Sequence, residues 1–233
     1  AKKDRLQLDS QYTHKKSVMY IQNWFYQSLN LLCQAALQGL YTCTIQGTDH
    51  IPPTGGFILV SNHLSHIDPP FLGSVLGREL SFFAKAELFE SPWLSWLETQ
   101  LKCIPIKRNS QQNLNAFRQG FQNLQQGYGL VIFPSGHRAK GSQPQEAKGG
   151  VGMMACRTQV PVIPARIFGT DQALGVGQGR PQLDIPIGLN IGAPLLPKDY
   201  DPGPLHPERY GEASYRINQA IYALPYPCPG GSR

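Results

Sequence analysis

Short apolar runs alternate with amphipathic segments through most of this 233-residue sequence. The apolar runs predict buried strands at residues 41–47, 56–62, 80–85, 103–108, 128–136, 160–168 and 183–192. The segments between them predict helices at residues 69–77, 91–101, 114–127, 149–159 and 208–224. Strands that alternate with helices in this way are typical of an α/β fold. We therefore expect a mixed, largely parallel sheet flanked by helices.

The N-terminal part does not follow this alternation. Residues 1–16 are polar and mostly basic, whereas residues 17–48 contain no charged side chain at all. Four apolar residues of the second stretch recur at helical spacing: Ile21, Phe25, Leu29 and Leu32. The amides between them are too frequent for a helix that spans a membrane, which needs about 20 predominantly apolar residues. We expect an amphipathic helix that lies in a membrane interface; the alternative is a long helix packed on the body of the domain.

These patterns divide the chain into three predicted parts. Residues 1–44 hold the basic arm and amphipathic membrane-interacting helices, residues 45–225 form the α/β domain, and residues 226–233 form a disordered tail. We expect no signal peptide, because the N-terminus is polar and no small-residue cleavage site follows an apolar core.

The charge balance narrows the choice of partners. Basic residues exceed acidic ones by six, and the isoelectric point is near 9.1. Such a balance favours a polyanionic partner, for example nucleic acid, an anionic membrane or a phosphorylated substrate. The basic residues are dispersed, without the aromatic-basic platform that single-strand binders use. We therefore expect no nucleic-acid partner.

The cysteines give no sign of a disulfide framework or a zinc ribbon. The five residues are Cys33, Cys43, Cys103, Cys156 and Cys228, and no two of them form a C-x-x-C pair. An odd number of widely spaced cysteines indicates buried or incidental thiols in a reducing compartment.

The stretch SNHLSHIDPP (61–70) carries the first candidate chemistry. It follows a predicted strand, and functional groups of α/β sheets gather at the carboxyl ends of strands. His63 with Asp68 in reach would be the base half of a catalytic triad. Because no G-x-S-x-G nucleophile is present, the base would deprotonate a hydroxyl of the substrate itself. The structural alternatives are a hydrogen-bonded core histidine, and Asp68 as helix N-cap with Pro69 at N1.

A metal site is the third interpretation of the same stretch. His63, His66 and Asp68 have a possible ligand spacing. No further cluster of ligands follows another predicted strand. We therefore expect no metal, and we assign no role to His66.

Three basic residues follow other predicted strands. Lys85 ends the run LSFFAK, Arg108 ends CIPIKR, and Arg138 lies in IFPSGHRAK. In the last segment, the backbone N–H groups of the Pro-Ser-Gly turn could bind an anion. The guanidinium of Arg138 could bind two oxygens of one phosphate at the same time. With His63 also at a strand end, these residues predict a phosphate pocket.

Taken together, these blocks resemble the glycerolipid acyltransferases, the PlsC-like 1-acylglycerol-3-phosphate O-acyltransferases with an H-x4-D motif. NHLSHID matches their first motif, and CIPIKR resembles the second. IFPSGHRAK resembles the third, usually Phe-Pro-Glu-Gly-x-Arg-Ser, and VPVIPARIFG resembles the fourth. The segment AKAEL around Lys85 is also similar. The blocks keep their order over about residues 45–195, roughly two thirds of the chain.

The resemblance implies transfer of a fatty acyl group from acyl-CoA or acyl-carrier protein to the sn-2 hydroxyl of lysophosphatidic acid, which gives phosphatidic acid. It implies His63 as general base and Asp68 as its orienting partner. Lys85, Arg108 and Arg138 would bind the acceptor phosphate, beside Ser135 and Gly136 of the acceptor-binding block. It also implies a location on the cytoplasmic face of a membrane and no cofactor beyond the acyl thioester.

The sequence departs from the family pattern in the third block. Ser135 stands where the family has glutamate, and His137 where threonine is common. Serine can bond a glycerol hydroxyl but cannot act as a carboxylate. The acceptor could therefore be another lysophospholipid, glycerol 3-phosphate or an amino-acid lipid. A catalytically impaired lipid-binding homologue is a further alternative.

Overall fold

The computed structural model describes residues 26–86, 90, 102–106, 113–139 and 143–228. A helix at residues 26–40 comes first. It is followed by β1 (Cys43–Gln46), the 3-10 helix η1 (Thr48–His50), β2 (Phe57–Ser61), α2 (Asp68–Val75), β3 (Leu80–Lys85), β4 (Ile104–Ile106), α4 (Leu114–Gln125), β5 (Gly129–Ile132), α5 (Gly150–Thr158), β6 (Val162–Phe168), α6 (Thr170–Leu174), β7 (Ile187–Ile191), α7 (Pro197–Tyr200) and α8 (Arg209–Tyr222).

Over the described residues, the strands form one seven-stranded sheet in the order β1-β7-β6-β2-β5-β3-β4. Every neighbouring pair is parallel except β6 and β7, which are antiparallel. The predicted mixed, largely parallel sheet is therefore confirmed. Because β2 lies at the centre, its carboxyl end has the carboxyl ends of β5 and β6 on either side.

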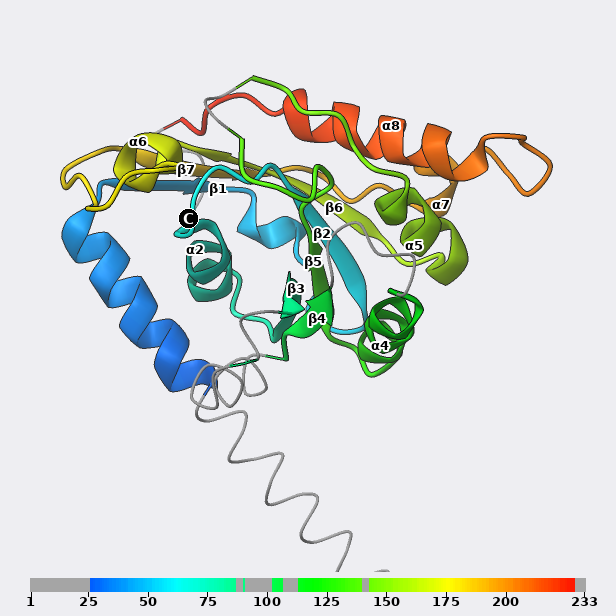
Figure 1. Cartoon of the computed structure of the whole chain (residues 1–233), viewed down its shortest axis with the longest axis horizontal. Helices are drawn as coiled ribbons and strands as arrows, with labels where there is room; N and C mark the ends of the chain where they lie inside the picture. The colour runs from blue at the N-terminus through cyan, green and yellow to red at the C-terminus, as the bar shows by residue number, and fades with distance from the viewer. Residues whose placement is uncertain (1–25, 87–89, 91–101, 107–112, 140–142, 229–233) are drawn as a thin grey trace, which may run out of the picture.

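The sheet buries both of its faces, which explains the continuous apolar runs. In β2, Phe57 and Leu59 enter one hydrophobic cluster, and Ile58 and Val60 enter the other. The first cluster includes residues of α2 and α6, and the second includes residues of α4, α5 and α8. Figure 1 shows α5 and α8 on one side of the sheet, and α2 and helix 26–40 on the other. Each large side chain buried here contributes roughly 1.5–3 kcal/mol.

Helix 26–40 is attached to the body near both of its ends. Tyr26 is only 3% exposed. Its hydroxyl accepts from the backbone N–H of Leu80 at 3.0 Å and donates to the carbonyl of Arg78 at 3.3 Å. Burial raises the pKa of this phenol, so it stays protonated. At the other end Leu37 packs against the first cluster, and Tyr41, directly after the helix, is buried in it.

Two residues of the predicted apolar stripe, Leu29 and Leu32, lie in the described part of this helix. Leu31 and Leu32 are 66% and 67% exposed, whereas Leu29 is half-buried. Ile21 and Phe25 lie outside the described residues. Leu32 of the predicted stripe is therefore exposed, while the helix packs on the domain through Tyr26 and Leu37. Within the described residues, no helix combines the length and apolar character needed to cross a membrane.

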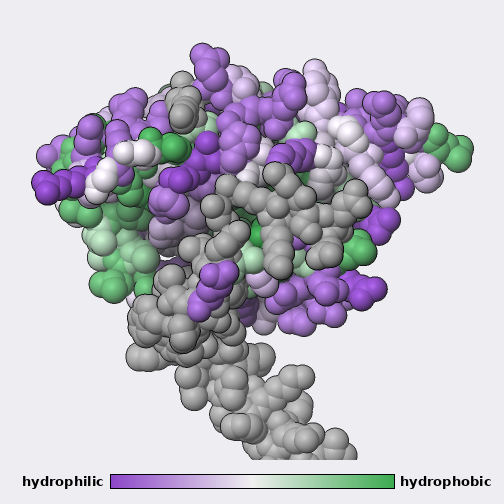
Figure 2. Space-filling view, in the orientation of Figure 1, coloured by the Kyte–Doolittle hydropathy of each residue, from purple (hydrophilic) through white to green (hydrophobic). Residues whose placement is uncertain are grey.

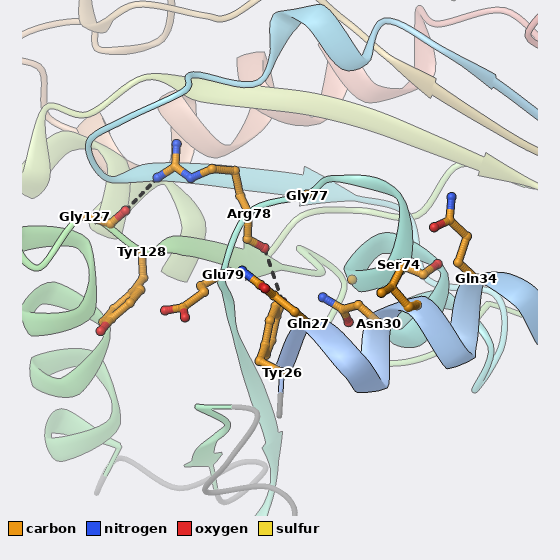
Figure 3. A pocket seen from close by; sticks show the side chains of 12 residues that line it. Tyr26, Gln27, Asn30, Gln34, Ser74, Gly77, Arg78, Glu79, Gly127 and Tyr128 are labelled. Carbon is orange, nitrogen blue, oxygen red and sulfur yellow. Dashed lines mark hydrogen bonds between the residues drawn. The ribbon is translucent and has the colours of Figure 1, made fainter. Parts of the chain in front are cut away.

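At the amino edge of the sheet, Arg78 joins three loops. Its guanidinium donates to the carbonyls of Pro52, Gly55 and Gly127, the last two at 2.9 and 2.7 Å. A cavity of about 560 Å³ lies next to it, between helix 26–40 and α2 (Figure 3). The amides of Gln27, Asn30 and Gln34 give this cavity a partly polar wall.

The predicted elements agree with the observed ones where both can be compared. Each predicted strand overlaps an observed strand, and the predicted helices overlap α2, α4, α5 and α8. The helix predicted at 91–101 lies outside the described residues. The short elements η1, α6 and α7 were not predicted, because none is long enough to give a periodic pattern.

Candidate active site

The structure brings His63 and Asp68 together at the carboxyl end of β2. Nδ1 of His63 lies 2.8 Å from Oδ2 of Asp68. The imidazole is 16% exposed and the carboxylate is completely buried. With Nδ1–H donating to the carboxylate, Nε2 keeps a free lone pair. The pair therefore has the geometry of an oriented general base.

Asp68 is held mainly by the loop that it closes. Its Oδ2 also accepts from the backbone N–H groups of Leu64 at 2.6 Å and Ser65 at 2.8 Å. The alternative N-cap role of Asp68 is wrong: Ile67 is the N-cap residue of α2, and Asp68 is the first residue of the helix. Its carboxylate turns back to the preceding loop and makes no cap hydrogen bond to the helix.

Asn62 extends the pairing between β2 and β6 beyond the last residue of β2. Its side-chain amide donates to the carbonyl of Ile167 at 2.8 Å, and its side-chain oxygen accepts from the N–H of Ile167 at 2.7 Å. The side-chain amide of Asn62 thus makes the two hydrogen bonds that the backbone of a further β2 residue would make with Ile167. The backbone at residue 62 is free to turn, and the next residue, His63, leaves the sheet.

On the other side, the segment after β5 contacts the same loop. The ring of Phe133 stacks on the imidazole of His63, with centroids 4.1 Å apart and planes 17° apart. The N–H of Ala139 donates to the carbonyl of His63 at 2.7 Å. Residues 133–139 therefore form one wall beside the base.

Ser135, Gly136 and Arg138 lie in this wall. Gly136 N–H donates to the Phe133 carbonyl at 3.0 Å, and Gly136 has a φ of 71°, which favours glycine. Ser135 is buried, and its hydroxyl donates to the carbonyl of His137 at 2.9 Å. Arg138 is half-buried. The serine hydroxyl is thus already used inside the turn.

The other two predicted basic residues are located less fully. The backbone of Lys85 ends β3, which pairs in parallel with β5, so it belongs to the same edge of the sheet as the wall. Its side chain is outside the described part of the structure. Arg108 lies outside the described residues, two positions beyond the end of β4.

A cavity of about 300 Å³ lies near the loop of the pair, on the β6 side. It is lined by Asn62 and Leu64, which flank His63 in the sequence, and by Phe168, Asp171 and Tyr226. His63 and Asp68 themselves do not line this cavity.

Sequence reasoning missed two side chains of the site. Thr170 donates to Oδ1 of Asp68 at 2.6 Å, and Phe133 stacks on His63. Phe133 lies near the end of the predicted strand 128–136, and Thr170 lies two positions after the predicted strand 160–168. Their positions near strand ends were the only local sign of a role in the site. As for metal ligands, the described residues contain no group of three or more His, Cys, Asp or Glu side chains suited to hold an ion.

Comparison with known proteins gives the family. The family model described as Acyltransferase matches residues 42–168, which include every described element from β1 to the end of β6. This segment contains His63, Asp68 and Phe133. It covers more than half of the chain.

The curated relatives carry acyltransferase names. The chain is 28% identical over 149 residues to the chloroplastic 1-acyl-sn-glycerol-3-phosphate acyltransferase BAT2 of Brassica napus, covering 63% of this chain and 43% of that protein. It is 25% identical over 182 residues to the 1-acyl-sn-glycerol-3-phosphate acyltransferase of Bacillus subtilis, covering 77% and 86%. It is 30% identical over 115 residues to the lyso-ornithine lipid O-acyltransferase of Pseudomonas aeruginosa, covering 49% and 44%.

A solved structure agrees with the architecture. The 1-acyl-sn-glycerophosphate acyltransferase PlsC of Thermotoga maritima matches with a TM-score of 0.71 over 87% of this chain and 80% of that chain, at 24% identity. This likeness establishes the fold alone. The chain spans less than half of the length of the Brassica relative. On the family match, the chain belongs to the Acyltransferase family.

Proposed function

We propose that this protein transfers a fatty acyl group from acyl-CoA or acyl-carrier protein to the sn-2 hydroxyl of lysophosphatidic acid. The observation that carries the proposal is the bond between His63 Nδ1 and the buried Asp68 carboxylate, which leaves Nε2 as a base. The printed names of the Brassica and Bacillus relatives support this acceptor. No metal and no further cofactor enters the proposed reaction.

In the proposed reaction, Nε2 of His63 takes the proton of the acceptor hydroxyl. The oxygen of that hydroxyl attacks the carbonyl carbon of the thioester at the same time. Asp68 stabilises the imidazolium that forms. The tetrahedral intermediate then collapses: the new ester C–O bond is kept, the C–S bond breaks, and the thiolate leaves. The imidazolium returns its proton to that sulfur, so the base is regenerated.

We assign the acceptor phosphate to the carboxyl edge of the sheet, with Lys85, Arg108 and Arg138 as its ligands beside Ser135 and Gly136. The hydrogen bond from Ala139 to His63 supports this for Arg138, because it joins the segment of Arg138 to the loop of the base. For Lys85, the support is its backbone position at the end of β3. For Arg108, it is the sequence resemblance alone.

An acyl-transfer assay with purified protein tests the proposal. Lysophosphatidic acid with acyl-CoA, and separately with acyl-carrier protein, should give phosphatidic acid. His63→Ala should lower kcat by roughly 10²–10⁴. The matched control is His206→Ala, which changes an exposed histidine in the loop before α8. Equal inactivity of wild type and His63→Ala with every acceptor, together with lipid binding, would instead support a lipid-binding protein.

A second acceptor class is an amino-acid lipid. Two observations favour it: the Pseudomonas relative is named for lyso-ornithine lipid, and the residue at the family's glutamate position is Ser135, whose hydroxyl is bonded within its own turn. An acceptor panel should include lysophosphatidic acid, other lysophospholipids, glycerol 3-phosphate and lyso-ornithine lipid. The acceptor with the highest kcat/KM decides between the two classes.

We further propose that the outer side of helix 26–40 lies on the cytoplasmic face of a membrane. The support is an uncharged helix whose Leu31 and Leu32 are two-thirds exposed. Figure 2 has a green, hydrophobic area on its left side, the side of this helix in Figure 1. The double change Leu31→Glu and Leu32→Glu should reduce sedimentation with anionic liposomes. The control is Leu205→Glu, at a leucine that is 96% exposed elsewhere; equal binding of all three proteins would refute the idea.

A further inference from the structure

Thr170 makes a buried hydrogen bond to the orienting carboxylate from a distant part of the chain. Its hydroxyl donates to Oδ1 of Asp68 at 2.6 Å, across 102 positions of sequence. Neither side chain is exposed to solvent. The His63 ring and the two loop N–H groups all bond the other oxygen, Oδ2. Thr170 is therefore the side chain that holds the second oxygen.

The hydroxyl of Thr170 does not serve its own helix. Thr170 is the first residue of α6, whose N-cap residue is Gly169, and no side-chain cap hydrogen bond is made. Gly169 has a φ of 77°, and a Cβ there would lie 2.2 Å from the carbonyl oxygen of Pro186. This glycine lets the chain turn sharply at the end of β6, so that the next side chain reaches Asp68.

The bond also connects the carboxylate to the strand beside the base. β6 pairs with β2 over Ile58–Ser61, and Asn62 continues that pairing to Ile167. Thr170 is only two residues beyond the end of β6. A carboxylate bonded through one oxygen alone can still rotate about its Cβ–Cγ bond. A donor on Oδ1 that is fixed to the neighbouring strand opposes this rotation.

We propose that Thr170 is a positioning residue for acyl transfer: it holds the Asp68 carboxylate in the plane in which Oδ2 meets His63. The inference rests on the proposed role of His63 as the base. Thr170 itself touches neither substrate nor reacting atom. Its contribution reaches the reaction through the orientation of the imidazole.

Three variants test this in the full chain. Thr170→Val keeps the shape and removes the donor, Thr170→Ser keeps the donor, and Thr158→Val removes a hydroxyl that bonds the α5 backbone. Thr170→Val should lower kcat roughly 10- to 100-fold, as for a lost hydrogen bond to a buried charge, with KM changed by less than about twofold. Thr170→Ser should stay within about threefold of wild type, and Thr158→Val should match wild type.

A second measurement needs no substrate. The imidazole proton that His63 shares with Asp68 should give a downfield proton NMR resonance, identified by its loss in His63→Gln. This resonance should broaden or disappear in Thr170→Val and persist in Thr170→Ser and Thr158→Val. Should Thr170→Val fail to fold by circular dichroism, Thr170→Cys, a weaker donor of similar size, takes its place.

The two measurements separate the proposals. An unchanged resonance together with an unchanged kcat in Thr170→Val would overturn the positioning role. A resonance that depends on Thr170 in a protein that transfers no acyl group to any acceptor would refute the proposed function and support the positioning of the imidazole. A kcat loss that Thr170→Ser does not restore would also overturn the inference.

Discussion

The imidazole of His63 lies nearly flat against the ring of Phe133, with the two ring centroids 4.1 Å apart. The ring nitrogen Nδ1 is fixed by Asp68 at its edge, and Phe133 restricts the ring from its face. A base restricted in both ways has little freedom left to lose when the substrate binds. This contact joins the end of β5 to the loop after β2.

Replacing Phe133 by alanine should therefore harm catalysis more than folding. The imidazole would gain freedom to tilt, and we expect kcat to fall about 10- to 100-fold, the range typical of small misplacements of a catalytic group. Steady-state kinetics measures the effect. Phe117→Ala, which removes a ring that packs on Phe83, is the control and should leave kcat near wild type. A folded Phe133→Ala protein with wild-type kcat would contradict this account.

Replacing Asn62 by alanine should destabilise the protein. The change removes both hydrogen bonds to Ile167, a residue that is 1% exposed, and leaves its N–H and carbonyl without these partners. We expect the free energy of unfolding to fall by about 1–3 kcal/mol. Urea unfolding measures it. The exposed Asn115→Ala in α4 should change it by less than about 0.5 kcal/mol; an equal effect of both changes would show that the Asn62 bonds add nothing.

Replacing Tyr26 by phenylalanine should loosen helix 26–40. The completely buried N–H of Leu80 would lose its acceptor, so we expect a loss of about 1–3 kcal/mol in the free energy of unfolding. Hydrogen exchange should become faster in residues 26–40 before the sheet is affected. Tyr215→Phe, at a tyrosine that is 59% exposed in α8, serves as the control. If Tyr26→Phe leaves hydrogen exchange in residues 26–40 unchanged, the Tyr26 hydroxyl does not hold the helix on the domain.

The Asp201–Arg209 pair predicts a pH dependence of stability. Arg209 donates to both oxygens of Asp201, at 2.7 and 2.5 Å, and its guanidinium holds the pKa of that carboxyl well below its usual range. A carboxyl with a lowered native pKa stabilises the fold above its unfolded pKa of about 3.9, and this stabilisation is lost as the pH falls toward the native value.

Asp201→Asn should therefore reduce the free energy of unfolding at pH 7, and the difference from wild type should shrink below about pH 4. Urea unfolding at several pH values checks this. Glu212→Gln, in the more exposed pair with Arg216, should have little effect at any pH. A difference that stays constant down to the most acidic buffer would contradict the assignment.

The sequence predicted the sheet and the His63–Asp68 pair because both leave local patterns. Apolar runs between glycine- and proline-rich turns mark the strands, and the pair lies within one short loop. The bond from Thr170 to Asp68 could not be found in this way, since its partners are 102 positions apart and only the parallel packing of β2 and β6 brings them together.

Two other features show the limits of local patterns. Asp68 before Pro69 has the composition of a helix cap, yet the loop N–H groups of Leu64 and Ser65 hold its carboxylate instead. In helix 26–40, the attachment through the Tyr26 hydroxyl could not be found from the spacing of apolar residues, because it is a polar contact with the backbone of Arg78 and Leu80. The predicted phosphate ligands Lys85, Arg108 and Arg138 remain a prediction.

Arg78 connects loops at the amino edge of the sheet, away from the candidate catalytic groups. One guanidinium bonds the carbonyls of Pro52 and Gly55 in the loop before β2 and of Gly127 in the loop before β5, so a substitution at residue 78 removes three hydrogen bonds at once. The candidate catalytic groups lie at the opposite edge. A substitution at Ser135, made to test its proposed part in acceptor choice, therefore leaves the hydrogen bonds of Arg78 at the amino edge untouched.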